Sequence, residues 1–157
     1  GTNGLGKTTI LKTIMKRLPA IGGSFNFNIN SKINYIEQDL QFRSKDINAI
    51  TFMNETYPRM SQKEIRTQLA KVGIKNDLAT KSIANLSGGE QVKIKLCALM
   101  QKESNILILD EPTNHLDVSA KEALFEALEV YDGAIILVSH EPMYAENLCT
   151  EIFDIEF

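Results

Sequence analysis

Apolar and polar positions follow two different patterns along this chain, one with helical periodicity and one of short continuous apolar runs. Residues 8–18, TTILKTIMKRL, repeat apolar side chains at helical spacing until Pro19. This pattern predicts a helix that ends before the proline. By contrast, NILILD at 105–110 and GAIILVSH at 133–140 are short continuous apolar runs. Such runs predict two strands, each buried on both faces of a parallel sheet.

Two more strands are predicted after a turn at Gly22 and Gly23. The segment SFNFNIN at 24–30 alternates strictly, and KINYIEQ at 32–38 carries a second alternating pattern. Alternation of this kind predicts a short strand and then a strand that ends near Gln38.

Helical patterns fill residues 46–100. SQKE at 61–64 has the sequence of a capping box, and Gly73 is a plausible helix C-cap. A second helix is predicted from near Gly88 to about Met100. The side chains expected to face inward are Ile65, Leu69 and Val72 in the first helix and Val92, Leu96 and Leu99 in the second. A further helix, SAKEALFEAL at 119–128, also opens with a capping-box sequence.

Strands that alternate with helices and end on polar residues predict a doubly wound α/β fold with its ligand at the strand carboxyl ends. We expect residues 1–45 and 101–157 to form this core. Residues 46–100 are expected to form a helical subdomain inserted beside the sheet.

Composition narrows the functional classes. The 157 residues, 43% of them hydrophobic, suit one domain, and the net charge of −3 argues against a broad basic nucleic-acid face. Cys97 and Cys149 have no metal-site spacing, which predicts reduced residues of a cytoplasmic protein. No apolar run approaches the length of a membrane span, so we expect no direct membrane insertion.

The opening residues, GTNGLGKT, match the phosphate-loop pattern G-x-x-x-x-G-K-[ST]. In this pattern backbone N–H groups surround phosphate oxygens, Lys7 reaches the β- and γ-phosphates, and the Thr8 hydroxyl binds Mg²⁺. An ordinary glycine turn before a helix is the alternative. The nucleotide-binding residues expected here are Gly1, Asn3, Gly4, Gly6, Lys7, Thr8 and Thr9.

NILILDE supplies a matching acid. Asp110 leaves the predicted buried strand where a phosphate-bound Mg²⁺ would lie, and Glu111 can orient water. Alone, this pattern could be a solvated strand end. Together with the phosphate loop it predicts a P-loop NTPase-type core that binds a nucleoside triphosphate and Mg²⁺.

LSGGEQ at 86–91 predicts a second anion site, because Ser87, Gly88 and Gly89, followed by Glu90, begin a helix with exposed N–H donors. One nucleotide does not need two such sites. A simple serine cap with flexible glycines is the alternative.

Six motifs occur in the order found in ABC-type ATPases, and the chain resembles that family over nearly its whole length. They are GTNGLGKTT, IEQD, LSGGEQ, ILILDEP, TNHLD and VSHE. The resemblance implies a head-to-tail pair of ABC domains, in one chain or in a homodimer. There the LSGGEQ helix of one domain closes over the nucleotide of the other.

The resemblance also implies roles for individual residues. Gln38 would sense Mg²⁺ and water, Glu111 would polarise the attacking water, and His140 would contact the γ-phosphate. Asp117 would cross the domain interface. In this family a strand precedes the phosphate loop, so we expect residues 1–157 to be a piece of a longer protein.

Within the family, EPTNHLD, VSHE and the 49-residue step from Gln38 to Ser87 look most like the ABC-F group, and IEQD with SHEP like its second domain. ABC-F proteins are soluble and act on ribosomes, in translation or antibiotic resistance. Ribosomal RNA contact would fall largely to regions outside this stretch.

Three alternatives remain. The chain could be the ATPase subunit of a membrane transporter, or a nucleotide-binding module that does not hydrolyse ATP. A chromosome-maintenance ATPase is the weakest of the three, because residues 38–87 hold only short helices instead of a long coiled coil.

Overall fold

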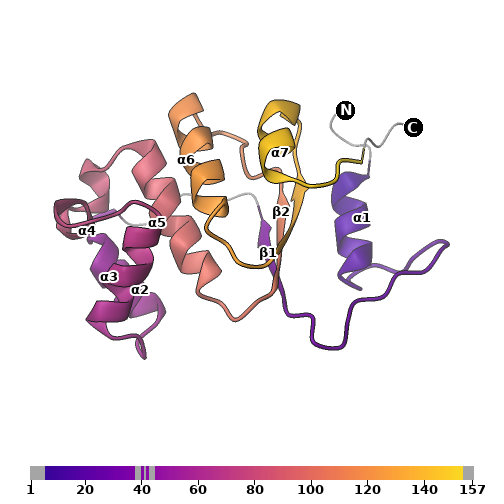
Figure 1. Cartoon of the computed structure of the whole chain (residues 1–157), viewed down its shortest axis with the longest axis horizontal. Coiled ribbons are helices and arrows are strands. Elements are labelled where there is room, and N and C mark those ends of the chain that lie inside the picture. Colours follow the sequence, from indigo (N-terminus) through magenta and orange to yellow (C-terminus); the bar gives the residue numbers. More distant parts are fainter. Residues whose placement is uncertain (1–5, 38–39, 41, 43–44, 154–157) are drawn as a thin grey trace. The chain divides into compact units, whose positions relative to one another are not determined.

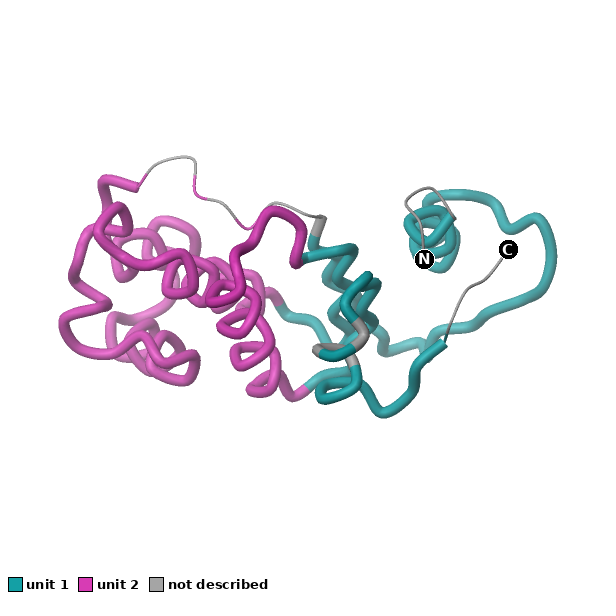
Figure 2. The backbone as a smooth tube through the Cα atoms, turned by 90° about the horizontal axis from the view of Figure 1, so that it is seen from above, with its two compact units in different colours: residues 1–38, 103–112, 133–157 teal, residues 39–102, 113–132 magenta. Residues whose placement is uncertain are grey.

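A computed structural model of the chain describes residues 6–37, 40, 42 and 45–153. The chain forms two compact units, coloured separately in Figure 2. Unit 1 comprises residues 1–38, 103–112 and 133–157, and unit 2 comprises residues 39–102 and 113–132.

Unit 1 is built on a parallel sheet with the strand order β1-β2-β3, flanked by helices (Figure 1). Its elements are α1 (Lys7–Ile14), β1 (Ile33–Glu37), β2 (Ile106–Asp110), β3 (Ala134–Val138) and α7 (Pro142–Leu148). The predicted parallel α/β class is therefore confirmed.

Strand β2 forms the centre of this sheet. It pairs with β1 on one side and β3 on the other, and its Leu107, Ile108 and Leu109 side chains are fully buried. Burying each such side chain stabilises the fold by roughly 1.5–3 kcal/mol. The prediction of a buried strand at 105–110 is confirmed.

Strand β3 is only half-buried, so the prediction that it is buried on both faces is wrong. In the described part of the chain, β3 has a paired neighbour on one side only. Apolar side chains on an edge strand remain partly accessible to solvent, whereas those on a central strand are covered by neighbours on both sides.

The strand predicted at 24–30 is also absent, and this segment carries no ladder hydrogen bonds among the described residues. Phe25 and Phe27 still contact each other edge to face at 6.4 Å. Alternation alone does not make a strand, because the backbone N–H and C=O groups need a neighbouring chain to pair with.

Helix α1 ends at Ile14, four residues before the predicted end. Lys16 adopts a positive φ of 59°, and the N–H of Arg17 donates to the carbonyl of Lys12 at 2.8 Å. The positive φ and this hydrogen bond are those of a Schellman C-cap. The cap satisfies carbonyl groups of the last helical turn and turns the chain away before Pro19.

Unit 2 is helical. Its helices are α2 (Ala49–Thr56), α3 (Gln62–Lys71), α4 (Asp77–Thr80), α5 (Gly88–Met100) and α6 (Val118–Leu128), with a 3₁₀ turn at Ile83–Asn85. The predicted capping box at α3 is confirmed, with Ser61 and Glu64 bonded in both directions. Gly73 closes the same helix at a φ of 85°.

The predicted burial of the two helices holds with one exception. In α3 and α5 the expected inward residues are buried, but Leu99 is only half-buried. Cys97 on α5 is buried as well, and burial raises the pKa of its thiol to about 12. This thiol therefore stays protonated at neutral pH.

Helix α6 begins two residues earlier than predicted, and the expected capping box at Ser119 is wrong. The N-cap is Asp117, whose carboxylate accepts from the N–H of Ala120 at 2.8 Å. Carboxylate and hydroxyl side chains can both accept from the free N–H groups of the first helical turn. Here Asp117, which precedes Ser119, takes this role and the helix starts earlier.

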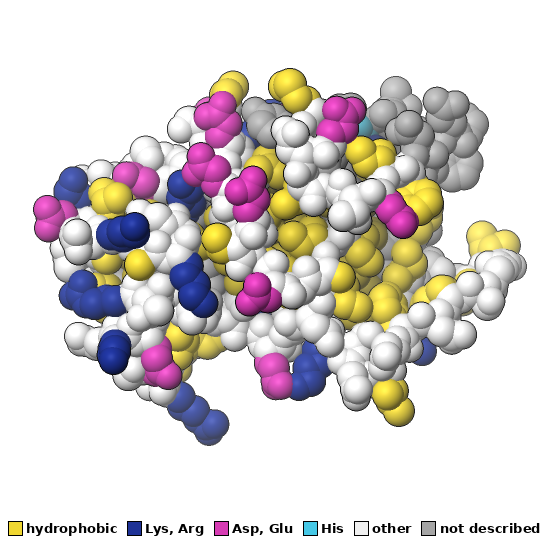
Figure 3. Space-filling view, viewed as in Figure 1, with side chains coloured by type: hydrophobic (Ala, Val, Ile, Leu, Met, Phe, Trp, Pro, Cys, Tyr) yellow, Lys and Arg dark blue, Asp and Glu magenta, His cyan; other side chains and the backbone are white. Residues whose placement is uncertain are grey.

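Positive charge gathers on unit 2, where Figure 3 shows several Lys and Arg side chains at the surface. Between residues 59 and 81 the exposed cations are Arg59, Lys63, Arg66, Lys71, Lys75 and Lys81, against the two carboxylates Glu64 and Asp77. The modest net charge of the chain therefore conceals a local basic excess.

In unit 2 the start of α5 packs against the first half of α6. A Cβ atom on Gly89 would lie 3.0 Å from the Cβ of Ala123 and 3.2 Å from the carbonyl oxygen of Ser119. On Gly88 the nearest atom, a carboxylate oxygen of Asp117, would be 3.6 Å away. Gly89, unlike Gly88, is thus required by packing.

We predict that Gly89→Ala destabilises the protein by about 1–3 kcal/mol, because the added methyl group meets backbone that cannot move freely. The matched Gly88→Ala variant should be neutral or stabilising by at most about 1 kcal/mol, since alanine favours helix. The midpoint of thermal unfolding of the full-length variants measures both. Equal midpoints for the two variants would contradict the packing argument.

Candidate functional site

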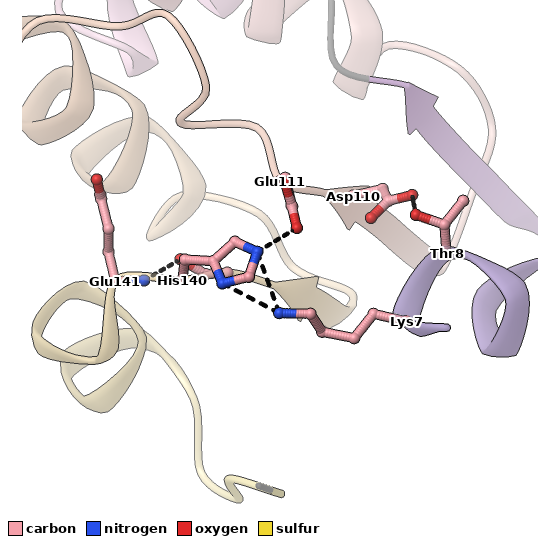
Figure 4. A network of polar contacts seen from close by, with 7 residues as sticks. Lys7, Thr8, Asp110, Glu111, His140 and Glu141 are labelled. Atoms are coloured by element: carbon pink, nitrogen blue, oxygen red, sulfur yellow. Dashed lines mark hydrogen bonds and ion pairs between the residues drawn. The ribbon is translucent and has the colours of Figure 1, made fainter. Parts of the chain in front are cut away.

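The first polar arrangement joins the start of α1 to the end of β2. The Thr8 hydroxyl donates to Oδ2 of Asp110 at 2.8 Å, across 102 residues of sequence (Figure 4). Parallel strands present their carboxyl ends at one edge, and a helix that starts at this edge meets them there. The expected partnership of Thr8 with Asp110 is therefore present in unit 1.

Lys7, Glu111 and His140 form a second group at the same edge (Figure 4). The Lys7 Nζ lies 3.1 Å from both ring nitrogens of His140, and Nε2 of His140 lies 2.5 Å from Oε1 of Glu111. These contacts bring together a cation, an imidazole and a carboxylate from three separate segments.

The contacts determine the arrangement of protons on His140. A lysine ammonium can only donate, and a carboxylate can only accept. The tautomer of His140 that carries its proton on Nε2 satisfies both neighbours, because Nε2–H donates to Glu111 while Nδ1 accepts from Lys7. We assign this tautomer from the hydrogen-bond network.

The backbone of Glu111 is held in an uncommon conformation. Its φ is 49°, in the left-handed region, and its N–H donates to the carbonyl of Val138 at 2.9 Å. This bond continues the pairing of β2 with β3 by one residue. Non-glycine residues in this region are uncommon and often mark functional sites, and no residue pattern reveals them in advance.

Two contributors were not expected from the sequence. The Tyr35 hydroxyl donates to Oδ2 of Asp110 at 3.1 Å, and the guanidinium carbon of Arg17 lies 5.0 Å from the centre of the Tyr35 ring. The only sign of this contact in the sequence was a tyrosine on a predicted strand. It becomes informative only when the register of that strand against the strand of Asp110 is known.

The oxygen atoms at Asp110 suit a small hard cation. Asp110 is 3% exposed, and its Oδ1 is buried without a hydrogen-bond partner. A carboxylate oxygen of this kind, beside the Thr8 hydroxyl, fits Mg²⁺, which is typically held by one or two carboxylates plus substrate phosphates. In the described ranges no group of three or more His, Cys, Asp or Glu side chains is placed to hold a metal ion by itself.

The phosphate-loop residues are described only in part. Gly6 takes a φ of 77° and is the N-cap of α1, and Thr9 lies exposed in its first turn. A left-handed N-cap is a conformation that glycine adopts at little cost. The predicted sites Gly1, Asn3, Gly4 and Gln38 lie outside the described residues.

The LSGGEQ residues begin α5 in unit 2. The Ser87 hydroxyl accepts from the N–H of Glu90 at 3.3 Å, and the Glu90 carboxylate accepts from the N–H of Ser87 at 2.7 Å. This is a complete capping box, so the simple structural role weighed from the sequence is present. Gly88 lies next to the Asp117 carboxylate, which places the LSGGEQ and TNHLD motifs side by side within unit 2.

A parallel sheet, a helix that begins at Lys7 after the N-cap Gly6 and a Thr–Asp pair at the strand ends fit a P-loop NTPase-type α/β fold. The family model described as "ABC transporter" matches residues 1–114, most of the chain. The chain therefore belongs to this family, and the resemblance to ABC-type ATPases is confirmed.

Curated relatives extend over nearly the whole chain. The uncharacterised ABC transporter ATP-binding protein YfmM of Bacillus subtilis is 41% identical over 99% of this chain and 30% of its own length. ATP-binding cassette sub-family F member 3 of Mus musculus is 36% identical over 98% of this chain and 22% of its own length. The chain thus spans less than a third of these relatives and is similar to a sub-family F member.

A solved structure shares the fold. An inward-facing metal-chelate type ABC transporter superposes with a TM-score of 0.67 at 19% identity, over 92% of this chain and 62% of the other. Identity at this level supports the fold alone. In the described ranges no helix has the length and apolar character needed to cross a membrane.

We predict that Lys7→Ala weakens nucleotide binding by about tenfold or more, because an ammonium that contacts phosphate in the ground state contributes to affinity directly. Titration of the full-length protein with a fluorescent ATP analogue measures this. Lys12→Ala, which changes a lysine of the same helix outside the polar group, is the control. Equal affinities for the parent and the Lys7→Ala variant would remove Lys7 from the phosphate site.

Proposed function

We propose that this chain binds ATP with Mg²⁺ in unit 1 and hydrolyses it when a second ABC domain closes over the site. The observation that carries the proposal is the Thr8–Asp110 hydrogen bond of 2.8 Å. It joins a phosphate-loop hydroxyl to a buried carboxylate with one unpartnered oxygen, which is the donor set that a nucleotide-bound Mg²⁺ requires. Family membership supports the same reading.

The residues of unit 1 would divide the work. Gly1, Asn3, Gly4 and Gly6 would offer backbone N–H groups to phosphate oxygens, together with the first turn of α1 at Thr9. Lys7 would balance the charge of the β- and γ-phosphates. Thr8, Asp110 and Gln38 would hold Mg²⁺, which neutralises negative charge on the phosphates.

Glu111 is the residue best placed to orient the attacking water. Its carboxylate already accepts from Nε2 of His140 at 2.5 Å, and its side chain is 15% exposed. In this structure the Nε2–H of His140 holds that carboxylate, and when nucleotide is bound the same N–H would donate to the γ-phosphate instead. A positioned carboxylate of this kind acts as a general base by taking a proton from water.

Ser87, Gly88, Gly89 and Glu90 would complete the site of the facing domain, with Asp117 beside them at the interface. A helix N-terminus acts on an anion only over its first turn, and Ser87 to Glu90 are the N-cap and first turn of α5. Donors aimed at the phosphate would stabilise the charge that develops in phosphoryl transfer.

The division of the chain is part of the same proposal. Residues 1–45 and 101–157 would act as the ATP-binding core and residues 46–100 as a helical subdomain that carries the signature motif. This functional division differs from the compact units, in which residues 39–45 and 113–132 belong to unit 2. The partner is a second ABC domain, in the same longer chain or in a homodimer.

For the biological setting we propose a cytoplasmic ABC-F protein that acts on the ribosome. Similarity to a sub-family F member over 98% of the chain favours this over a transporter subunit. The fold match to a transporter does not decide the question, because both classes share the domain. A module that only binds nucleotide is disfavoured by the contact between Glu111 and His140.

We predict that Glu111→Gln keeps ATP binding while hydrolysis falls by about 10²–10⁴-fold, the usual contribution of one general base. Steady-state phosphate release and nucleotide titration of the full-length protein measure the two properties. Glu146→Gln, an exposed change on α7 of the same unit, is the control. Unchanged turnover in Glu111→Gln would exclude this residue as the base.

We predict that Ser87→Arg lowers ATPase turnover while ATP binding at the domain's own phosphate loop stays within about twofold. The large side chain would meet the nucleotide of the facing domain and prevent closure. Ser87 belongs to unit 2, whereas Lys7 and the domain's own phosphate loop belong to unit 1. The measurement is again turnover against affinity in the full-length protein.

Ser61→Arg is a matched control, because it breaks a capping box of the same geometry on α3. Loss of a cap costs about 0.5–2 kcal/mol in either helix. If the two arginine variants lose turnover equally, Ser87 is merely a helix cap.

A further inference from the structure

The two oxygens of Asp110 are used unequally. Oδ2 accepts two hydrogen bonds, from the Thr8 hydroxyl at 2.8 Å and from the Tyr35 hydroxyl at 3.1 Å. Oδ1 is buried and has no hydrogen-bond partner. The donors thus fix one oxygen of the carboxylate and leave the other for a ligand.

The strand register explains how Tyr35 reaches this carboxylate. Tyr35 lies opposite Ile108, two residues before Asp110 on the neighbouring parallel strand. Paired residues point to the same face of a sheet, and alternate residues along a strand do so too. Two residues of a strand span about 6.6 Å, which is about the reach of a tyrosine side chain lying along the strand.

The Tyr35 ring is held from its other side. The guanidinium carbon of Arg17 lies 5.0 Å from the ring centre, within the range of a cation–π interaction. Arg17 itself is held by the Schellman cap of α1, through its N–H bond to Lys12 at 2.8 Å. Both ends of α1 are therefore connected to Asp110, the first turn through Thr8 and the C-terminal end through Arg17 and Tyr35.

We propose that Tyr35 is a positioning residue for the divalent cation that accompanies the nucleotide. Its hydroxyl donates to Oδ2 of Asp110 and so keeps the carboxylate in the orientation in which Oδ1 can bind the cation. This inference rests on the proposed function of unit 1, because it concerns the same Mg²⁺ site. Groups that orient a metal ligand in this way commonly change metal affinity by 10–100-fold when removed.

The test is Tyr35→Phe in the full-length protein, which removes the hydroxyl and keeps the ring. Binding of Mn²⁺, used in place of Mg²⁺ and followed by EPR at saturating ATP, gives the metal affinity without any need for turnover. Titration of a fluorescent ATP analogue in excess EDTA gives the metal-free nucleotide affinity. We expect the Mn²⁺ dissociation constant to rise by about 10–100-fold and the metal-free nucleotide affinity to stay within about twofold.

Tyr57→Phe is the matched control. It removes a hydroxyl that donates to the carbonyl of Ala98 at 2.5 Å in unit 2, and it should leave both affinities as in the parent. Arg17→Ala is a second variant, which keeps the hydroxyl but frees the ring. It should raise the Mn²⁺ dissociation constant by a smaller factor than Tyr35→Phe.

Three results would overturn the inference. Unchanged Mn²⁺ binding in Tyr35→Phe would show that the hydroxyl does not position Asp110. Equal losses of nucleotide affinity with and without metal would show a general structural role. If the parent protein binds no nucleotide at all, the proposed function itself fails, and the inference fails with it.

Discussion

A buried carboxylate at the end of the central strand organises unit 1. Asp110 is 3% exposed and lies at the carboxyl end of β2, where it receives hydroxyl groups from α1 and β1. An ionised carboxylate in such a place is costly unless hydrogen bonds or a cation compensate it. The sheet, the phosphate-loop helix and Tyr35 are arranged so that this compensation is available, and the neighbouring Glu111 is held by the same strand pairing.

Unit 2 obeys a packing constraint of a different kind. The start of α5 lies so close to α6 that a Cβ atom on Gly89 would lie 3.0 Å from the Cβ of Ala123, and the same turn carries the serine cap. One short motif therefore provides both a tight helix contact and a capping box. The anion site proposed for the same turn would add a functional requirement to these structural ones.

Much of this could be predicted from the sequence, because the relevant signals are local. Helix α5 begins and ends where its serine cap and apolar spacing predict, and β2 follows from its continuous apolar run. The presence of Thr8 and Asp110 at one site was predictable, because both motifs indicate a phosphate-bound Mg²⁺, whereas the hydrogen bond between them was not. The predictions were wrong where the structure of a segment depends on a neighbour that is distant in the sequence. The alternating segment at 24–30 has no ladder partner among the described residues, and β3 is covered on fewer sides than its composition suggests.

Other features have no local signal at all. The positive φ of Glu111 depends on the bond to Val138, and the contact of Tyr35 with Asp110 depends on the register of two strands far apart in sequence. Residue patterns predict which groups take part in a site, whereas the strand register determines how each group is held.

The most direct test of a nucleotide site at the Thr8–Asp110 pair is a double-mutant cycle on Mg·ATP affinity in the full-length protein. Thr8→Val, Asp110→Asn and the double variant should all bind metal-free ATP nearly as the parent does. With Mg²⁺ present, each single variant should lose affinity for Mg·ATP. The double variant should lose little more affinity than the more impaired of the two single variants, because both residues act through one cation. Fully additive losses, or Mg·ATP affinities equal to that of the parent, would contradict a shared metal–nucleotide site.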